Sequence, residues 1–365
     1  MTKILIVVGT RPNFIKITQF RKEALRFPNL EIKIVHTGQH YDANMSDVFF
    51  EQFNIFPDYY LEAEKGSACK QLASIIEKLD LFINTTYLPD LILAPGDVNS
   101  TLAAALVANK NNICLGHIES GLRSMDRTMP EEHNRILVDQ MSDICFVTEP
   151  SGMQNLANEN SLASIYYVGN TMIDTLTAFN NEIENTPILA ELALSKKSYT
   201  LITMHRPKNV DTAQGIAFIA ALLEKLSKKT KIVFPVHPRT LKQIPKEALA
   251  KIQNNKKIKL LPPIGYFQFQ KLVKEAKCII TDSGGIQEET TFLKVPCLTI
   301  RPNTERPITA EIGTNTLLIN NIALIEKYVE RIFEGTYKIG AVPELWDGKA
   351  TTRILESITS YFKNN

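Results

Sequence analysis

Residues 281–289, TDSGGIQEE, combine a pattern that binds anions with a pair of carboxylates. A strand-like run ends at this stretch, and Gly284 and Gly285 open what we predict to be a helix. Free backbone N–H groups and the positive end of the helix dipole favour an anion at such a position. Glu289 lies in the second helical turn, where its carboxylate would repel the same anion. The stretch therefore calls for a ligand that offers an anionic group to the glycines and a different group to the carboxylate.

Charged side chains also follow many of the other strand-like runs. In parallel α/β sheets, the carboxyl ends of the strands meet at one edge, and ligands bind there. So many charged groups at this edge, in both halves of the chain, exceed what turns require. The residues concerned are Gly9, Arg11 and Lys16 after the run 3–8, Asp97 after 90–94, Glu119 and Arg123 after 112–117 with Glu131 shortly beyond, His205 after 199–204 and His237 after 231–236.

Each of these residues also has an ordinary structural interpretation. Asp97 and Ser100 can cap a helix that begins near residue 101. The pattern at 128–131, TMPE, matches a capping box with proline in the first turn, which would make Glu131 a structural residue. Considered one by one, these residues do not identify a functional site. The remaining charged residues can be loop or surface groups: Arg11, Lys16 and His205.

Short apolar runs rich in β-branched residues alternate with helical patterns along the whole chain, which is typical of parallel sheets with helices on both faces. The rhythm restarts near residue 198, and twelve strands are too many for one doubly wound domain. We therefore predict an α/β fold of two Rossmann-like domains facing a central cleft. The twelve runs are 3–8, 31–36, 90–94, 112–117, 144–148, 165–169, 199–204, 231–236, 258–262, 278–281, 296–300 and 316–319.

The domain boundaries follow from the same pattern. Residues 1–170 form the predicted N-terminal domain and residues 171–349 the C-terminal one, with the polar segment 180–198 near the join. A final helical pattern at 350–365 can pack back on the first domain. No internal repeat, low-complexity tract or Gly/Ser linker is visible in the sequence.

Composition excludes several classes of protein. The chain has 365 residues, of which 44% are hydrophobic and 22% charged, values typical of globular proteins. A formal net charge of +2 without a long basic run gives no support to nucleic-acid or membrane-surface binding. No run approaches the roughly 20 apolar residues of a membrane helix. No His/Cys/Asp cluster has the spacing of metal ligands, and Gly9 does not belong to a GxGxxG fingerprint, so we expect neither a metal nor NAD.

The cysteines and the N-terminus indicate the compartment. The five cysteines are widely spaced, form no CxxC pair, and mostly lie in apolar runs, as buried reduced thiols do. The N-terminal apolar run covers only residues 4–8 and leads into Gly-Thr-Arg-Pro, which is better interpreted as a buried strand than as a signal peptide. We therefore expect a cytoplasmic protein.

Eight motifs occur in chain order over nearly the whole length of the sequence. They are GTRPNFIK (9–16), GQHYD (38–42), GDVNST (96–101), GHIESGLRS (116–124), MPEEHNR (129–135), HRPKN (205–209), DSGGIQEE (282–289) and TERP (304–307). With these motifs the sequence is similar to the non-hydrolysing UDP-N-acetylglucosamine 2-epimerases. The resemblance implies a fold of the glycosyltransferase-B type, usually as a homodimer, and the interconversion of UDP-GlcNAc and UDP-ManNAc without a cofactor.

The resemblance also implies a site and a reaction route. It places the diphosphate on the N–H groups around Ser283, Gly284 and Gly285. Glu289 lies roughly 8–9 Å further along the helix, at 1.5 Å per residue, and suits the ribose hydroxyls. The implied route is elimination of UDP to 2-acetamidoglucal followed by re-addition, which needs acid and base groups on both faces of the sugar. The family's catalytic positions match Asp97, Glu119, Glu131 and His205, and its nucleotide site adds Arg11, Lys16, His205 and Arg306.

Several departures from the family pattern keep alternatives open. Asn13 and Phe14 stand where many members have Glu-Ala, and QHYDANM (39–45) replaces a segment associated with activation by substrate. Related enzymes epimerise modified UDP-N-acetylhexosamines, which is the first alternative. A UDP-sugar-dependent glycosyltransferase of the same fold is the second, and a nucleotide-sugar-binding protein without catalysis is the third.

Overall fold

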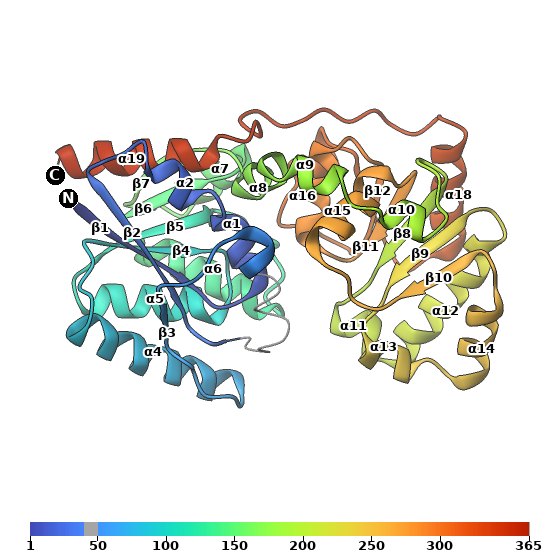
Figure 1. Cartoon of the computed structure of the whole chain (residues 1–365), viewed down its shortest axis with the longest axis horizontal. Helices are drawn as coiled ribbons and strands as arrows, with labels where there is room; N and C mark the ends of the chain where they lie inside the picture. The colour runs from blue at the N-terminus through green and yellow to red at the C-terminus, as the bar shows by residue number, and fades with distance from the viewer. Residues whose placement is uncertain (40–49, 365) are drawn as a thin grey trace. The chain divides into compact units, whose positions relative to one another are not determined.

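The computed structural model describes residues 1–39 and 50–364 (Figure 1). Most of the GQHYD motif and the QHYDANM segment lie outside the described residues. The chain divides into two compact units: Met1–Ala178 with Glu344–Asn365, and Phe179–Pro343. Each unit is built on its own parallel sheet.

The sheet of the first unit has seven strands in the order β3-β2-β1-β4-β5-β6-β7. All six strands predicted for this half are present, and the apolar runs of the central strands β1, β4, β5 and β6 are buried, as in other parallel sheets. The additional strand, β3, pairs with the end of β2 through two residues, a length too short to show any period in the sequence. The strands are β1 (Thr2–Val8), β2 (Leu30–His36), β3 (Tyr59–Tyr60), β4 (Leu91–Pro95), β5 (Cys114–Ser120), β6 (Ile144–Val147) and β7 (Ser164–Tyr167).

Helices connect these strands and cover the sheet. Helix α5 is largely buried: its small side chains Ala103, Ala104 and Ala105 are fully inaccessible and let the helix pack closely against β4 and its neighbours. The helices of this unit are α1 (Arg11–Ile17), α2 (Phe20–Ala24), α4 (Ala68–Thr85), α5 (Asn99–Lys110), α6 (Pro130–Met141), α7 (Pro150–Asn158), α8 (Thr171–Ala178) and α19 (Ala350–Asn364).

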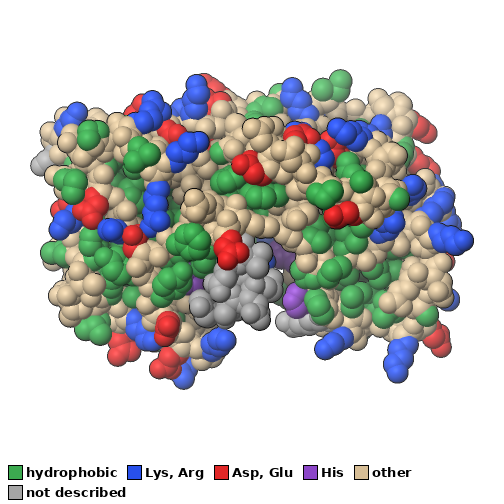
Figure 2. All heavy atoms as spheres, viewed as in Figure 1, with side chains coloured by type: hydrophobic (Ala, Val, Ile, Leu, Met, Phe, Trp, Pro, Cys, Tyr) green, Lys and Arg blue, Asp and Glu red, His purple; other side chains and the backbone are tan. Residues whose placement is uncertain are grey.

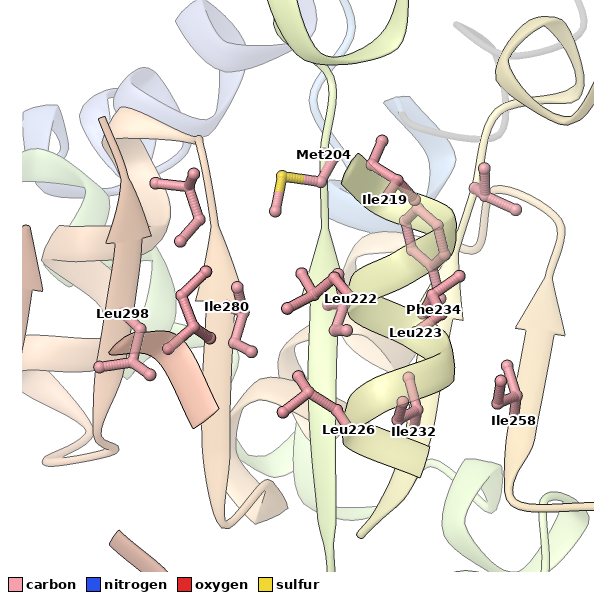
Figure 3. Close-up of a cluster of buried hydrophobic side chains, with 14 of the residues drawn as sticks. Met204, Ile219, Leu222, Leu223, Leu226, Ile232, Phe234, Ile258, Ile280 and Leu298 are labelled. Atoms are coloured by element: carbon pink, nitrogen blue, oxygen red, sulfur yellow. The ribbon is translucent and has the colours of Figure 1, made fainter. Parts of the chain in front are cut away.

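The sheet of the second unit has six strands in the order β10-β9-β8-β11-β12-β13, and all six were predicted. Figure 3 shows its core, in which Leu222, Leu223 and Leu226 of one helix, α12, point toward the strand side chains Ile232, Phe234, Ile280 and Leu298. The strands are β8 (Tyr199–Thr203), β9 (Lys231–Pro235), β10 (Ile258–Leu261), β11 (Cys278–Thr281), β12 (Cys297–Ile300) and β13 (Asn315–Leu318).

The helices of the second unit alternate with its strands, as the sequence rhythm predicted. They are α9 (Asn180–Glu184), α10 (Ile188–Glu191), α11 (Pro207–Val210), α12 (Ala213–Ser227), α13 (Pro238–Gln243), α14 (Lys246–Asn254), α15 (Tyr266–Glu275), α16 (Gly284–Phe292), α17 (Ile308–Glu311) and α18 (Ile322–Phe333).

The chain passes between the units at two places. The polar segment 180–198 forms α9 and α10 and belongs to the second unit, because Ile183 and Ile188 are buried and Glu184 pairs with Lys271 of α15. The chain returns to the first unit at Glu344, and Figure 1 shows α19, in red, among the blue and green elements of that unit.

The C-terminal return is fixed by specific contacts within the first unit. Asp174 of α8 accepts the backbone N–H groups of Ala350 (3.0 Å) and Thr351 (2.6 Å), and so caps the start of α19. The indole of Trp346, 2% exposed, donates to the carbonyl of Thr148 at 2.9 Å. The last helix is therefore part of the first unit's core.

Both sheets have a topological switch point. In the first, β1 lies between β2 and β4, and in the second, β8 lies between β9 and β11. At such a point the connections leave the central strands in opposite directions, which opens a crevice at their carboxyl ends. The residues predicted to do chemistry follow β1, β4, β5, β8 and β11, so the fold brings them to these two edges.

On the face drawn in Figure 2, Lys and Arg side chains alternate with Asp and Glu over both units. No helix among the described residues is long and apolar enough to cross a membrane. In the same part of the chain, no group of three or more His, Cys, Asp and Glu side chains could hold a metal ion.

Candidate functional site

The first unit buries an ion pair at the carboxyl edge of its sheet. The ammonium group of Lys16, in α1, donates a hydrogen bond to the carboxylate of Glu119 at the end of β5, and both residues are 7% exposed. The loop after β4 passes over this pair at Gly96, where a Cβ atom would lie 2.9 Å from Lys16 Nζ. Gly96 has φ +72°, so only glycine combines this backbone conformation with the close approach.

Glu119 occupies a bulge in β5. The pairing of β5 with β6 shifts register between Ile118 and Ser120, and Glu119 has φ +75°, a conformation that costs a non-glycine residue free energy. The bulge interrupts the alternation of side chains and directs this carboxylate toward Lys16. Strain of this kind persists where the surrounding structure holds a functional side chain in place.

Asp97 is held by helix α6 and does not cap a helix. Its carboxylate pairs with Arg135 at 2.5 Å, and its backbone carbonyl accepts the side-chain amide of Asn134 at 2.8 Å. Helix α5 begins at Asn99 with Val98 as its N-cap and has no side-chain cap. The alternative that Asp97 and Ser100 cap this helix is therefore wrong.

The two glutamates of the MPEEHNR motif have different roles. Glu132, 1% exposed, accepts the N–H and hydroxyl of Ser124 and pairs with Arg135. Glu131 is exposed and has no hydrogen bond or ion pair with any described residue. The predicted capping box does not form, because the helix begins at Pro130 after Met129, and Thr128 bonds to Asp126 instead. Glu132 is thus the structural carboxylate, and Glu131 is left available for a ligand.

A buried histidine braces the loop that carries Asp97. His117, fully buried on β5, contacts Asp139 through Nδ1 (2.6 Å) and the carbonyl of Gly96 through Nε2 (2.8 Å). Arg123 also pairs with Asp139, at 2.7 Å. Burial alone would raise the pKa of the Asp139 carboxyl, but His117 and Arg123 outweigh burial and hold that pKa below its usual value. The ring of His117 thereby links Asp139 of α6 to the loop after β4.

Asn13, noted in the sequence only as a departure from the family pattern, links two loops of the site. It is 2% exposed, its Oδ1 accepts the Thr10 hydroxyl at 2.8 Å, and its amide donates to the Pro95 carbonyl at 2.8 Å. The loop after β1 is thereby joined to the loop after β4. The neighbouring Arg11 is partly buried at the start of α1, and burial lowers the pKa of its guanidinium.

In the second unit, helix α16 presents its N-terminus at the end of β11. Ser283 is the N-cap, and its own N–H donates to Thr281 Oγ1 at 3.0 Å. The N–H groups of Gly284 and Gly285 have no partner among the described residues. A Cβ atom at Gly284 would lie 2.7 Å from Arg306 Nη1, so glycine lets this guanidinium approach the helix end. Gly284, Gly285 and Arg306 therefore lie together, as predicted for an anion site.

The charge of Arg306 is already shared with two carboxylates. Arg306 lies 2.8 Å from Glu288 and 2.7 Å from Glu305, and Glu305 also pairs with Arg301 at 2.7 Å. All four residues are 7% exposed or less. The two positive and two negative groups balance, which lowers the cost of burying each of them.

Glu289 differs from its neighbour Glu288 because no cation pairs with it in the described part of the chain. It is 4% exposed, and it accepts a hydrogen bond from the Gln270 amide at 2.6 Å. Burial raises the pKa of the Glu289 carboxyl to about 7; the Gln270 bond opposes this shift and the charge of Glu288 adds to it. The carboxylate thus carries a free energy cost that a ligand offering hydroxyl donors would reduce.

His205 follows β8 and contacts a buried carboxylate that sequence reasoning did not single out. His205 Nδ1 lies 2.8 Å from Asp282 Oδ1. The side chain of His205 is 63% exposed and that of Asp282 is inaccessible. The available signal was that Asp282 directly follows β11, the neighbour of β8, whose last residue Thr281 is in register with Thr203.

The structure thus groups the predicted residues in two sets. Within the first unit, Lys16 contacts Glu119, and the Asp97 loop lies beside this pair, with Glu131 on the adjoining α6. Within the second unit, the α16 N-terminus, Arg306 and Glu289 lie on one helix and its neighbours, with His205 on the next strand.

Comparison with known proteins decides the family. The sequence profile of the family described as UDP-N-acetylglucosamine 2-epimerase matches residues 22–359. The chain belongs to the UDP-N-acetylglucosamine 2-epimerase family. This confirms the resemblance that the eight motifs indicated, and with it an isomerase family.

Individual members of the UDP-N-acetylglucosamine 2-epimerase family match over most of their length. A protein from Methanococcus maripaludis, described as a UDP-N-acetylglucosamine 2-epimerase homolog, is 42% identical over 364 residues, which cover 97% of this chain and 98% of that protein. A UDP-2,3-diacetamido-2,3-dideoxy-D-glucuronate 2-epimerase from Pseudomonas aeruginosa is 37% identical over 321 residues, 87% of this chain and 88% of the other.

A solved structure of the same family confirms the fold. The crystal structure of Methanocaldococcus jannaschii UDP-GlcNAc 2-epimerase, in complex with UDP-GlcNAc and UDP, is 37% identical and has a TM-score of 0.88, covering 98% of this chain and 100% of that one. The predicted α/β fold of the glycosyltransferase-B type, with two Rossmann-like parallel sheets, is therefore confirmed.

Proposed function

We propose that this protein is a non-hydrolysing UDP-GlcNAc 2-epimerase that interconverts UDP-GlcNAc and UDP-ManNAc. The observation that carries the proposal is the match over 98% of the chain to an epimerase structure solved with UDP-GlcNAc and UDP. The acid, base and anion-binding groups described above support it, because they lie at the switch points of the two sheets.

We propose nucleotide-binding groups in each unit. The diphosphate would accept hydrogen bonds from the N-terminus of α16, at Gly284 and Gly285, with Arg306 beside it. Glu289 would accept the ribose hydroxyls. Further groups of the nucleotide site are proposed to be Arg11, Lys16, His205 and Ser283.

The proposed reaction is an elimination followed by re-addition. The C1–O bond breaks, its electron pair leaves with UDP, and a base takes the proton from C2, which gives 2-acetamidoglucal. UDP then adds back to C1 as C2 takes a proton on the opposite face. Asp97, Glu119 and Glu131 are the proposed acid and base groups, and the Lys16 ion pair supports Glu119 in its charged form.

Two features of this proposal concern its setting. We place the enzyme in the cytoplasm as a homodimer that supplies ManNAc units for surface polysaccharide. The five cysteines are all free thiols, which supports a reducing compartment.

A first experiment tests the reaction directly. Purified protein is incubated with UDP-GlcNAc in D2O without added cofactor and followed by proton NMR. The expected result is UDP-ManNAc with deuterium at C2, together with traces of UDP and 2-acetamidoglucal. Free ManNAc with stoichiometric UDP would replace the proposal by a hydrolysing enzyme, and transfer of GlcNAc to an acceptor would replace it by a glycosyltransferase.

Substitutions test the named residues. Asp97→Asn and Glu131→Gln are expected to lower kcat by two or more orders of magnitude, the usual contribution of a general acid or base. Glu77→Gln, an exposed glutamate on α4, is the matched control and should leave kcat unchanged. A near-normal rate in either test variant would remove that residue from the mechanism.

A second substrate is favoured by one comparison. The Pseudomonas aeruginosa relative is a 2-epimerase of a diacetamido glucuronate sugar and is 37% identical. If folded protein binds UDP but leaves UDP-GlcNAc unchanged, the same NMR experiment with that modified sugar nucleotide decides whether the chain epimerises it.

A further inference from the structure

The carboxylate of Asp282 is surrounded by hydrogen-bond donors. Its Oδ1 lies 2.8 Å from His205 Nδ1 and 3.0 Å from the His205 backbone nitrogen. Its Oδ2 accepts the backbone N–H of Arg206 at 3.0 Å and the amide of Asn209 at 2.8 Å. Protein groups therefore donate hydrogen bonds to both oxygens of this carboxylate, which is inaccessible to solvent.

The ionisation of Asp282 follows from its partners. Burial alone raises the pKa of this carboxyl, but the hydrogen bonds from His205, Asn209 and Arg206 outweigh burial and bring that pKa below its usual value. Asp282 is therefore an acceptor toward every neighbour. Because an ionised carboxylate cannot donate, the hydrogen atom between it and the His205 ring must belong to Nδ1.

This fixes the free side of the His205 ring. With Nδ1 bound to Asp282, the other ring nitrogen, Nε2, has no hydrogen bond with a described residue, and the side chain is 63% exposed. The ring is anchored on its buried side and open on the other. Neither backbone bond to Asp282 would hold the ring in this orientation without the Nδ1 contact.

The position of Asp282 relates the ring to the anion site of the same unit. Strands β8 and β11 are neighbours, and the hydroxyls of Thr203 and Thr281 lie 2.8 Å apart at their ends. Asp282 is followed immediately by Ser283, the N-cap of α16. One short segment therefore supplies both the carboxylate that holds His205 and the helix N-terminus that would bind a diphosphate.

We propose that Asp282 is a positioning residue that holds His205 with Nδ1 protonated, so that Nε2 meets the diphosphate of the nucleotide sugar. The assignment rests on the proposed function, which supplies the diphosphate as the ligand. When Nε2 is also protonated it donates to the departing phosphate oxygen, and the adjacent carboxylate stabilises the positive ring. Other catalytic histidines are oriented by a buried aspartate in the same manner.

The ring tautomer gives a test that does not depend on activity. Long-range ¹H–¹⁵N NMR of the ligand-free protein, at a pH where the ring is neutral, distinguishes Nδ1–H from Nε2–H, and the spectrum of His205→Gln identifies the His205 signals among the six histidines. We expect Nδ1–H in the native protein. In Asp282→Asn the side-chain amide cannot accept from all four donors, and we expect the Nε2–H form to become substantial. Nε2–H as the main native form would overturn the proposal, as would an unchanged tautomer in Asp282→Asn.

A matched variant separates positioning from general loop stability. Asn209→Ala removes a donor to the same carboxylate, at 2.8 Å, without touching His205. It should keep the native tautomer and kcat within a few fold. Asp282→Asn should lower kcat roughly 10²-fold, the scale of a misplaced acid–base group, with circular dichroism and Tm close to those of Asn209→Ala.

A double-mutant cycle completes the test. If Asp282 acts through the ring, Asp282→Asn has little further effect on kcat in the His205→Gln background. Losses that multiply would mean that Asp282 only stabilises the loop, and would overturn the proposal. If no epimerase activity is found with any sugar nucleotide, the proposed function fails, while the tautomer measurement still decides the role of Asp282.

Discussion

Replacing Glu289 by glutamine should stabilise the second unit at alkaline pH while weakening nucleotide binding. Glu289 is 4% exposed and its pKa rises from an ordinary 4.5 to about 7. Each tenfold change in proton affinity corresponds to about 1.4 kcal/mol, so the ionised carboxylate costs the native state about 3 kcal/mol. The near-complete burial of the group means that solvent screening does not reduce this figure appreciably.

The sign of the effect follows from the direction of the pKa shift. The native state binds the proton more tightly than the unfolded chain, so native Glu289 costs little below pH 4.5. Stability is lost as pH rises from 4.5 to 7, and the whole cost is present at pH 8. Glutamine keeps the acceptor for the Gln270 amide and carries no charge. Glu289→Gln should therefore resemble the native protein at pH 4.5 and exceed its stability by about 3 kcal/mol at pH 8.

The measurement must report on the second unit alone. Hydrogen exchange of the β11 and α16 amides, compared between variant and native protein at the same pH, gives the opening free energy of this region. The single tryptophan, Trp346, belongs to the first unit, so its fluorescence should show no change and serves as an internal control.

A neighbouring variant provides the contrast. Glu288→Gln breaks a buried ion pair with Arg306 and should destabilise the same region by about 3 kcal/mol at pH 8, since it leaves a buried cation without one of its carboxylates. An equal gain from Glu289→Gln at both pH values, or a loss at pH 8, would refute the assignment of a raised pKa to Glu289.

Three further outcomes are expected. If Glu289 binds the ribose hydroxyls as a carboxylate, native affinity for UDP should increase as pH rises toward 7, and isothermal titration should show this dependence abolished in Glu289→Gln. Glu132→Gln should lower Tm by several degrees, because it removes the charge that pairs with Arg135 and replaces one of two occupied acceptor oxygens by an N–H donor, whereas Glu131→Gln should lower kcat with Tm unchanged; the reverse pattern would exchange their roles. Burial raises the pKa of Asp174 from 3.8 to about 6, so native stability from this group is lost between those values as pH rises. The free energy of unfolding of Asp174→Asn, relative to that of the native protein, should therefore rise by about 3 kcal/mol between pH 4 and pH 7. Urea unfolding followed by Trp346 fluorescence measures this difference, and a difference that does not change with pH would contradict the prediction.

The regular parts of the fold could be predicted because their physical signal is local. Most of the twelve predicted strands are short buried runs bounded by turn residues, and burial on both faces gives such a run its continuous apolar pattern. Strand β3 could not be predicted, since its two residues pair with β2 only because the fold brings them there.

The site was predicted as a set of residues, but the roles of neighbours were not. Glu131 and Glu132 are adjacent and chemically identical, and only the packing of Ser124 and Arg135 separates them. Asp282 and Asn13 act through contacts with distant segments, namely His205 and Pro95, so no spacing rule could have identified them. The bulge at Glu119 likewise depends on register with β6.

The return of the chain to its first unit at Glu344 has a consequence for the order of synthesis. The second unit, 179–343, is continuous in sequence and can complete its core as soon as it has left the ribosome. The first unit begins earlier and finishes later, because Trp346 and α19 arrive only after the whole second unit has been made. Until then, the surface that Trp346 and α19 cover is exposed on the nascent chain. Loss of the last twenty residues would therefore damage the unit that was synthesised first.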